Sequence, residues 1–321
     1  MRGEGNDGVN SATIARPRLG ELLDAGLGKD MTLVVAPAGY GKSVLLTEWC
    51  STLDLPVAWI RMTEDDNDAG RLVRSLVTAV EDALEEPIAS IDDRLNFASP
   101  MNAPSLIEEW AEQLVAVGEL VLVVDDLHVL TDSSATEAVQ RFTEASPSNV
   151  HIYIASRHDP PLGTGRLRLE GHLTEVRQRD LAFTIDELCS FLAAASINLD
   201  EDSLRTLHSR TDGWPAGLRL AQISMMQTGD PERVVRELEG TNRIIADYLV
   251  EEVLDDMKPE QRNFLLHTSV LDDVTPEIAQ ILTGRVDGAV VLGELAAAGA
   301  FTTRVSVDTF WYHRLLRDVL R

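Results

Sequence analysis

The first part of the chain alternates short apolar runs with amphipathic segments. Apolar runs occur at 32–36 and 57–60 and within the segments 119–130 and 149–158, and a run of mixed polarity follows at 173–181. Short continuous apolar runs are typical of strands buried on both faces, whereas mixed polarity suits a strand at a sheet edge. The pattern therefore predicts five strands.

Segments with helical spacing separate these runs. Apolar residues that recur every three or four positions predict helices around 19–23, 45–49, 72–80 and 106–117. Residues 86–104 contain three prolines and are expected to form a loop. Strands that alternate with helices predict a doubly wound parallel sheet, and so an α/β fold class.

The pattern changes after Phe183. Thr184 and Glu187 have the spacing of a helix N-cap with a capping box, and helices with almost no strands are expected from there to about residue 300. Residues 300–312 have the alternation of a small hairpin that turns at Val307-Asp308, and a short helix follows. Several helices followed by a hairpin predict a winged-helix-like unit.

Composition limits the kind of protein. The 321 residues suffice for two or three domains, and no apolar stretch is long enough to span a bilayer. Residues 1–15 lack a signal-peptide core and are expected to be a disordered tail. Only Cys50 and Cys189 occur, which excludes a disulfide framework and fits a cytoplasmic protein. The net charge of −25 argues against direct DNA binding by these residues.

The loop after the first strand carries candidate chemistry. Residues 36–43 read APAGYGKS, which matches the phosphate-binding pattern GxxxxGK[ST] except that Ala36 replaces its first glycine. Glycine lets the loop turn its N–H groups inward, Lys42 can reach the outer phosphates, and Ser43 offers a hydroxyl to Mg²⁺. A turn that binds no ligand is the alternative interpretation.

Charged residues follow the third and fourth strands. Asp125 and Asp126 lie where a parallel sheet binds its ligands, and we expect Asp125 to hold Mg²⁺ and Asp126 to orient a water molecule. Arg157 ends the next strand and could stabilise the charge of a transferred phosphoryl group. The alternatives are an acidic pair without a function, since such pairs are common after strands, and a surface arginine that pairs with a nearby acid.

Taken together and in order, these motifs resemble the ATPase core of the large ATP-binding LuxR-type transcriptional activators, a family of STAND-class P-loop NTPases that includes the activator of the maltose regulon. The resemblance rests on segments 16–19, 36–43, 123–130, 154–162, 177–187, 211–221, 247–255 and 312–320. It implies a P-loop nucleotide-binding domain at 16–182, a helical domain at 183–228 and a winged-helix-like domain at 229–321.

The resemblance also implies roles for residues beyond the loop. Pro215 is similar to a proline that packs on the adenine, and His313 to a histidine that reaches the β-phosphate of ADP. A helix-initiating proline and a residue that starts the last helix are the respective alternatives. The expected nucleotide contacts are Arg16, Pro37, Ala38, Gly39, Tyr40, Gly41, Lys42, Ser43, Val44, Pro215 and His313.

The function implied is that of a switch in a signal-responsive transcriptional activator. ADP is expected to keep it closed and monomeric, ATP with an inducer to promote self-association, and slow Mg²⁺-dependent hydrolysis to reset it. DNA and RNA polymerase would be contacted only by domains absent from this chain, which we expect to be part of a longer protein or, as the alternative, a natural short form. No membrane contact is expected.

Two other functions compete with the switch. One is a motor or remodelling ATPase driven by continuous turnover, which would need an arginine from a second subunit that the sequence does not identify. The other is an interaction scaffold that no longer hydrolyses nucleotide, against which the intact Gly41-Lys42-Ser43 and Asp125-Asp126 motifs argue.

Overall fold

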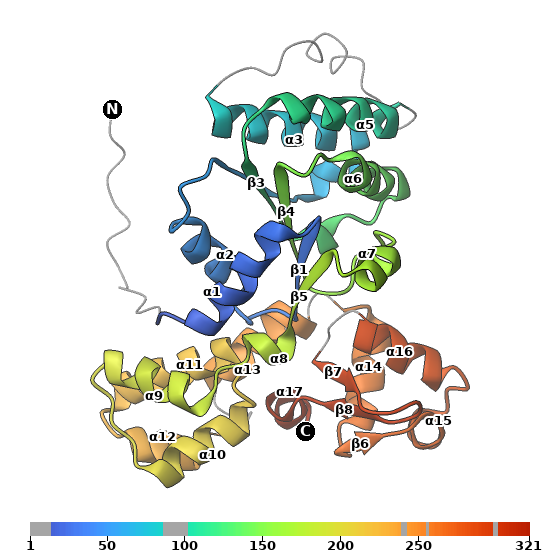
Figure 1. Ribbon diagram of the computed structural model, residues 1–321. Helices are drawn as coiled ribbons and strands as arrows, with labels where there is room; N and C mark the ends of the chain where they lie inside the picture. Colours follow the sequence, from blue (N-terminus) through green and yellow to red (C-terminus); the bar gives the residue numbers. More distant parts are fainter. Residues whose placement is uncertain (1–13, 86–101, 239–242, 255–256, 298–300) are drawn as a thin grey trace.

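The computed structural model describes residues 14–85, 102–238, 243–254, 257–297 and 301–321. Most of the expected N-terminal tail and of the expected 86–104 loop lies outside these residues, although a helix already begins at Ala103. The chain folds into three parts, which we call the sheet part (α1 to α8), the helical segment (α9 to α13) and the C-terminal unit (α14 to α17) (Figure 1).

The sheet part contains five strands and the helices between them. Its elements are α1 (Pro17–Asp24), η1 (Ala25–Gly28), β1 (Met31–Val35), α2 (Lys42–Cys50), β2 (Val57–Arg61), η2 (Glu64–Asn67), α3 (Ala69–Leu84), α5 (Ala103–Gln113), η3 (Leu114–Ala116), β3 (Leu120–Asp125), η4 (Leu127–Val129), α6 (Ser133–Ala145), β4 (Val150–Ser156), α7 (Gly165–Glu170), β5 (Leu173–Arg177) and α8 (Gln178–Leu181).

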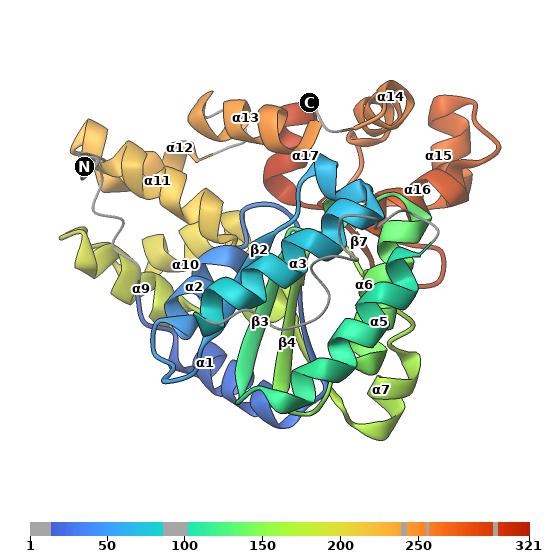
Figure 2. The same ribbon diagram turned by 90° about the horizontal axis from the view of Figure 1, so that it is seen from above.

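All five strands are parallel and follow the order β2-β3-β4-β1-β5, so the predicted α/β fold class is confirmed. Successive side chains of a strand point to opposite faces. Leu33 and Val35 pack with α3, α5 and α6, whereas Val34 packs with α1 and α2. Figure 2 shows α3 and α5 lying across one face of the sheet. Burial on both faces explains why the central strands are apolar throughout.

The predicted fifth strand is shorter than the sequence pattern suggested. β5 does lie at the sheet edge, but it ends at Arg177, and residues 178–181 form α8 instead of continuing the strand. The cause is local, because the Asp180 carboxylate accepts a hydrogen bond from the Arg177 backbone N–H at 2.8 Å and so starts a helical turn.

The remaining parts are mainly helical, as predicted. The helical segment comprises α9 (Ile185–Ala194), α10 (Glu201–Thr211), α11 (Pro215–Thr228), α12 (Pro231–Glu237), α13 (Arg243–Leu249) and the π-helical turn η5 (Val250–Leu254). The C-terminal unit comprises α14 (Pro259–Thr268), β6 (Asp273–Val274), α15 (Pro276–Thr283), α16 (Gly288–Ala297), β7 (Thr302–Arg304), β8 (Phe310–Tyr312) and α17 (Arg314–Leu320).

Local signals in the sequence account for these helices and for the hairpin. Prolines stand at the first position of α11, α12, α14 and α15, where the missing N–H has no intrahelical partner to lose. The predicted capping box of Thr184 and Glu187 is present. β7 and β8 form the predicted hairpin, and β6 adds a third antiparallel strand.

One continuous hydrophobic core joins the three parts. It runs from Leu45 in the sheet part through Leu218 in the helical segment to Leu315 in the C-terminal unit. Among the described residues, no helix is both long enough and apolar enough to cross a membrane.

A polar clamp reinforces the junction between the sheet part and the helical segment. Glu187, at the start of α9, accepts hydrogen bonds from Arg16 at 3.1 Å and from Arg18 at 2.8 Å. Both guanidinium groups also donate to the Ala182 carbonyl. Although burial acts in the opposite direction, the hydrogen bonds from Arg18 and Arg16 hold the pKa of Glu187 below its ordinary value.

This clamp predicts an uneven response to two neighbouring substitutions. Glu187→Ala removes the ion pairs and the capping box and leaves Arg16 buried without its partner, so we expect a loss of about 2 to 4 kcal/mol of unfolding free energy. Asp186→Ala, one residue earlier on the exposed side of α9, should cost only about 0.3 to 1 kcal/mol. Chemical denaturation measures both, and equal losses would contradict the role of the clamp.

Candidate nucleotide-binding site

The loop between β1 and α2 has the conformation of a phosphate cradle. Gly39 and Gly41 have φ values of +75° and +76°, which residues with a Cβ rarely adopt. Gly41 is the N-cap of α2, so the free N–H groups at the start of that helix adjoin the loop. Ala36 and Ala38 are buried, whereas Val44 is half exposed on α2.

Lys42 is folded back onto its own loop. Its side chain is buried, and Nζ donates to the carbonyls of Ala36 at 2.8 Å and Pro37 at 3.1 Å. Burial, and then the nearby charge of Arg157, lower the pKa of Lys42 to about 8. A phosphate placed in the loop would stabilise the charged form of this lysine more than the two carbonyl dipoles do, because the phosphate carries a full negative charge.

Ser43 and Asp125, the two predicted metal ligands, lie near each other. The Ser43 hydroxyl favours the ionised form of the Asp125 carboxyl, and Asp125 is only 2% exposed. Burial raises the pKa of Asp125 above its ordinary value. Among the described residues, no group of three or more histidine, cysteine or carboxylate side chains is arranged so that it could hold a metal ion by itself. One hydroxyl and one carboxylate fit Mg²⁺, which completes its shell with phosphate oxygens and water.

Asp126 has an unexpected partner. It lies just after β3 with φ +57°, and its carboxylate accepts a hydrogen bond from Arg61 Nε at 2.8 Å. Arg61 ends β2, where its backbone pairs with Asp125. Arg61 was not predicted from the sequence as a site residue, although an arginine at the end of a neighbouring parallel strand was a visible signal.

His128 lies close to the same carboxylate, and the charge of Arg157 acts on His128. His128 Nδ1 is 3.8 Å from Asp126 Oδ1. Burial, and then the charge of Arg157, lower the pKa of His128 to about 4, so this ring is neutral at pH 7. Arg157 also acts electrostatically on Lys42, as Asp126 does, so both predicted charges lie within electrostatic reach of Lys42.

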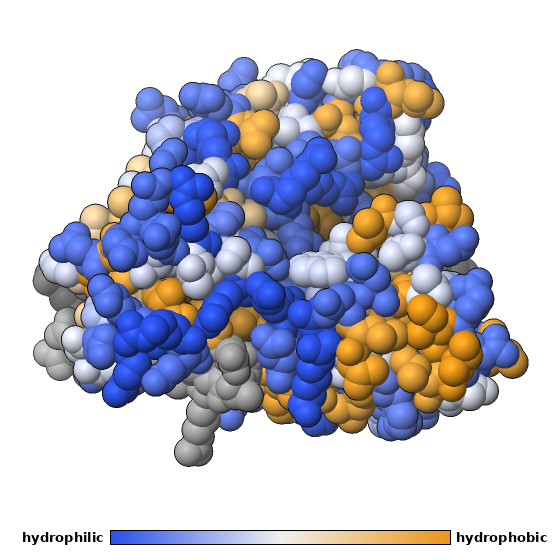
Figure 3. All heavy atoms as spheres, turned by 90° about the horizontal axis from the view of Figure 1, so that it is seen from below, coloured by the Kyte–Doolittle hydropathy of each residue, from blue (hydrophilic) through white to orange (hydrophobic). Residues whose placement is uncertain are grey.

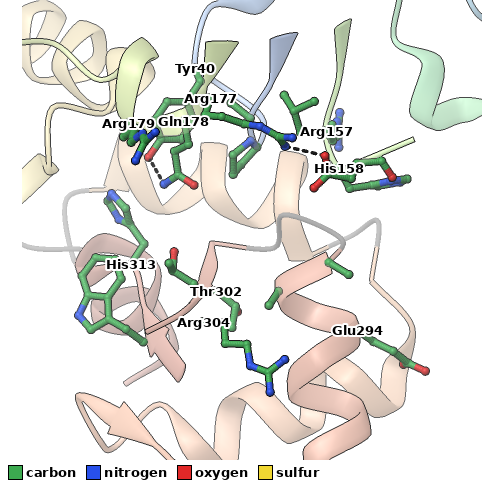
Figure 4. A pocket seen from close by; sticks show the side chains of 18 of the residues that line it. Tyr40, Arg157, His158, Arg177, Gln178, Arg179, Glu294, Thr302, Arg304 and His313 are labelled. Atoms are coloured by element: carbon green, nitrogen blue, oxygen red, sulfur yellow. Dashed lines mark hydrogen bonds and ion pairs between the residues drawn. The ribbon is translucent and has the colours of Figure 1, made fainter. Parts of the chain in front are cut away.

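A cleft of about 1120 Å³ opens between the sheet part and the C-terminal unit. Five arginine or lysine side chains and three carboxylates line it, an excess of positive charge in a strongly acidic chain. Figure 4 shows the two walls facing each other. The residues of the walls include Pro37, Tyr40, Arg157, Arg177, Gln178 and Arg179 on one side, and Lys258, Glu294, Thr302, Arg304 and His313 on the other.

Tyr40 is fixed at the loop side of this cleft. Its hydroxyl accepts a hydrogen bond from Gln178 Nε2 at 2.7 Å, and the ring is almost completely buried. The contact ties the phosphate loop to the turn that follows β5 (Figure 4). The loop is therefore braced by side chains from outside its own sequence.

His313 reaches the cleft from the C-terminal unit. It is the N-cap of α17, it is 1% exposed, and Nε2 lies 3.2 Å from the Thr211 carbonyl. Nδ1 is buried without a hydrogen-bond partner in the part of the chain that the structure describes. Burial lowers the pKa of His313 to about 4.

Of the predicted nucleotide contacts, Pro37, Tyr40 and His313 line the cleft, whereas Arg16 and Pro215 do not, and neither do Ala38, Gly39, Gly41, Lys42, Ser43 and Val44. Pro215 is the first residue of α11 and is partly buried between two residues that bond the phosphate loop, Trp214 and Ala216. Arg16 donates to Glu187 and to two carbonyls of the segment before α9, and its guanidinium lies 4.5 Å from the centre of the Phe183 ring. A role of either residue toward a nucleotide stays a prediction.

The fold and the site together define a P-loop NTPase module, and comparison with known proteins gives the family. A family model of the MalT winged helix domain matches residues 250–321, and a model of an AAA domain matches residues 26–159. The chain belongs to the P-loop ATPase modules that carry a MalT-type winged-helix domain, as the sequence motifs predicted.

Two curated relatives align over almost the whole chain. The serine/threonine-protein kinase PknK of Mycobacterium tuberculosis is 31% identical over 96% of this chain and 28% of its own length. The HTH-type transcriptional regulator MalT of Vibrio cholerae is 30% identical over 96% of this chain and 35% of its own length. The chain thus spans about a third of the curated relatives it matches.

A solved structure has the same fold. The Walker-type ATPase of Pyrococcus abyssi superposes with a TM-score of 0.63 at 15% sequence identity, covering 97% of this chain and 97% of that chain. At this identity the match supports the arrangement of the three parts and carries no information on the ligand.

The buried, neutral His313 predicts a pH dependence of stability. Below the ordinary histidine pKa of 6.5, the unfolded chain binds a proton that folded His313 does not bind. The unfolding free energy should therefore fall between about pH 6.5 and pH 4, by up to about 3 kcal/mol for this group. His313→Gln should flatten the profile, whereas the exposed control His267→Gln should not. Identical profiles for the two variants and the unchanged chain would contradict the burial of a neutral His313.

Proposed function

We propose that the chain is a nucleotide-dependent switch module that binds ADP or ATP with Mg²⁺. The observation that carries the proposal is the cleft whose walls combine the phosphate loop with the C-terminal unit, where His313 presents a buried, unpartnered ring nitrogen. A diphosphate in the loop would give that nitrogen an anionic partner and would connect the two walls.

The residues of the loop and the strand ends would divide the chemistry. Lys42 would exchange two carbonyls for phosphate oxygens, while Ser43 and Asp125 would hold Mg²⁺, which neutralises phosphate charge when bound. Asp126 would orient the attacking water, and Arg157 would stabilise charge on the transferred group. The Asp126 carboxylate already accepts a hydrogen bond from Arg61, so it is less available to orient a water molecule. This supports slow hydrolysis.

The switch needs two states with different nucleotide preferences. We propose that ADP favours the packed arrangement described here and that ATP, with an inducer, favours separation and self-association. A change from 1:99 to 99:1 requires about 5.5 kcal/mol of differential affinity. Figure 3 shows apolar side chains gathered on the C-terminal unit, and such a surface supports contact with another chain. The exposed residues there include Ile278, Ile281, Leu282, Val286 and Val290.

The output of the switch is proposed from the relatives. By analogy with the MalT regulators, the module would control transcription in the cytoplasm, and regions outside this chain would contact DNA and RNA polymerase. The similarity to PknK favours a second candidate, control of an attached protein kinase. Within the module, we propose domain boundaries at 16–182, 183–228 and 229–321, so that α12, α13 and η5 of the helical segment would belong to the third domain.

The first test concerns nucleotide binding itself. The purified chain should carry ADP that mass spectrometry identifies after denaturation, because a closed switch releases it slowly. Lys42→Ala should lose the nucleotide, with affinity in calorimetry reduced at least a hundredfold, since it removes the buried cation of the loop. Lys29→Ala, at a partly exposed lysine before β1, is the control. A Lys42→Ala variant that still copurifies with ADP would refute the site.

The second test separates a switch from a turnover-driven ATPase. His313→Ala should speed release of ADP roughly tenfold and shift the chain toward larger assemblies with ATP, because it removes a contact across the cleft. Stopped-flow release of a fluorescent ADP and light scattering measure these two effects. Fast steady-state hydrolysis with unchanged ADP release would favour the motor or remodelling alternative.

A further inference from the structure

The start of α11 is packed against the outer side of the phosphate loop. Trp214 Nε1 donates a hydrogen bond to the Ala38 carbonyl at 3.2 Å, and the Ala216 backbone N–H donates to the Gly39 carbonyl at 3.0 Å. Two consecutive carbonyls of the loop are thus bound by the helical segment, which lies about 175 residues away along the chain.

These two bonds orient the opposite side of the same peptide groups. In a planar trans peptide, the C=O and the N–H point in opposite directions, and the described residues contain no cis peptide bond. The Ala38 carbonyl shares its peptide with the Gly39 N–H, and the Gly39 carbonyl shares its peptide with the Tyr40 N–H. Holding both carbonyls toward α11 therefore turns the N–H groups of Gly39 and Tyr40 away from α11, toward the concave side of the loop.

The packing at this contact leaves no free space. A Cβ atom added to Gly39 would lie 2.7 Å from Ala216 Cβ and 2.7 Å from Trp214 Nε1. The Trp214 side chain is completely buried. A shift of the indole ring must therefore move the loop, or leave the Ala38 carbonyl without its partner.

The same indole ring also touches the C-terminal unit. Its centroid lies 5.1 Å from that of Phe301, with the rings nearly perpendicular, and 5.8 Å from the His313 ring. Tyr248, on α13, lies 5.7 Å away. Edge-to-face pairs of this kind favour one relative placement of the rings. Trp214 is thus in contact with the phosphate loop on one side and with the C-terminal unit on the other.

We propose that Trp214 is a positioning residue that aims the Gly39 N–H group at the phosphates while the helical segment and the C-terminal unit are packed together. Separation of the C-terminal unit then loosens Trp214, the Ala38 carbonyl loses its donor, and nucleotide affinity falls. By linkage, bound nucleotide stabilises the packed arrangement by the same factor. This inference rests on the proposed nucleotide binding and adds the residue that couples binding to domain packing.

The test compares two buried tryptophans. Trp214→Phe keeps an aromatic ring but removes the donor to Ala38, so we expect ADP affinity in calorimetry to fall roughly three- to tenfold. Trp110→Phe is the matched control, because Trp110 is equally buried and packs on Phe142 in a separate core between the sheet and α3, α5 and α6. Its Nε1 has no hydrogen-bond partner within the described residues. This control should leave ADP affinity unchanged. Equal affinities in both variants and the unchanged chain would overturn the inference.

A second measurement reports on the loop directly. Hydrogen exchange of a peptide covering residues 38–45, in the presence of ADP, should quicken in Trp214→Phe and stay unchanged in Trp110→Phe. Phe301→Leu tests the route to the C-terminal unit, because it loosens the indole without touching the loop, and it should also weaken ADP binding and quicken this exchange. Unchanged exchange in both Trp214→Phe and Phe301→Leu overturns the coupling.

These outcomes distinguish the inference from the function on which it rests. ADP binding that depends on Lys42 but is indifferent to Trp214 leaves the proposed function intact and refutes the positioning role. An unchanged chain that binds no adenine nucleotide with Mg²⁺ refutes both.

Discussion

The conformation of the loop between β1 and α2 is the constraint on which the candidate site depends. Positive φ angles at Gly39 and Gly41 allow successive backbone N–H groups to converge, and no other residue type adopts this geometry as readily. The loop is too short to contain a core of its own. Its shape is therefore set by what surrounds it: the buried strand before it, the helix after it, and the contacts of Tyr40, Ala38 and Gly39 with later parts of the chain.

Electrostatics adds a second reason for a ligand at this place. Lys42 and His313 are both buried, and burial lowers the pKa of each well below its ordinary value. Dipoles of the protein alone compensate poorly for the cost of burying the charged form of such a group. In a chain of net charge −25, an excess of positive charge around one cleft concentrates the attraction for anions at the phosphate loop and not over the whole surface.

The sequence was most informative where signals are local. Apolar runs located the strands, proline and Thr184 marked helix starts, and the spacing of Lys42, Ser43 and Asp125 identified groups that the fold brings together. α6 was not predicted, although Asp132 caps it and Phe142 faces the core at helical spacing. The position of Arg61 at a strand end was a signal, but its pairing with Asp126 depends on which strands are neighbours in the sheet. The contact of Trp214 with Ala38 could not be predicted, because it depends on how the parts pack, which no local pattern encodes.

The continuous core has a consequence for solubility. Moving the C-terminal unit away from the helical segment would uncover Phe301, Trp214 and the apolar flank of α17 around Leu315 and Leu316, all of them buried in the packed arrangement. Aromatic surface that becomes exposed to solvent associates nonspecifically with other apolar surfaces. An opened molecule therefore has a limited lifetime on its own in a crowded cell: it must close again, bind a partner, or be captured by chaperones and proteases.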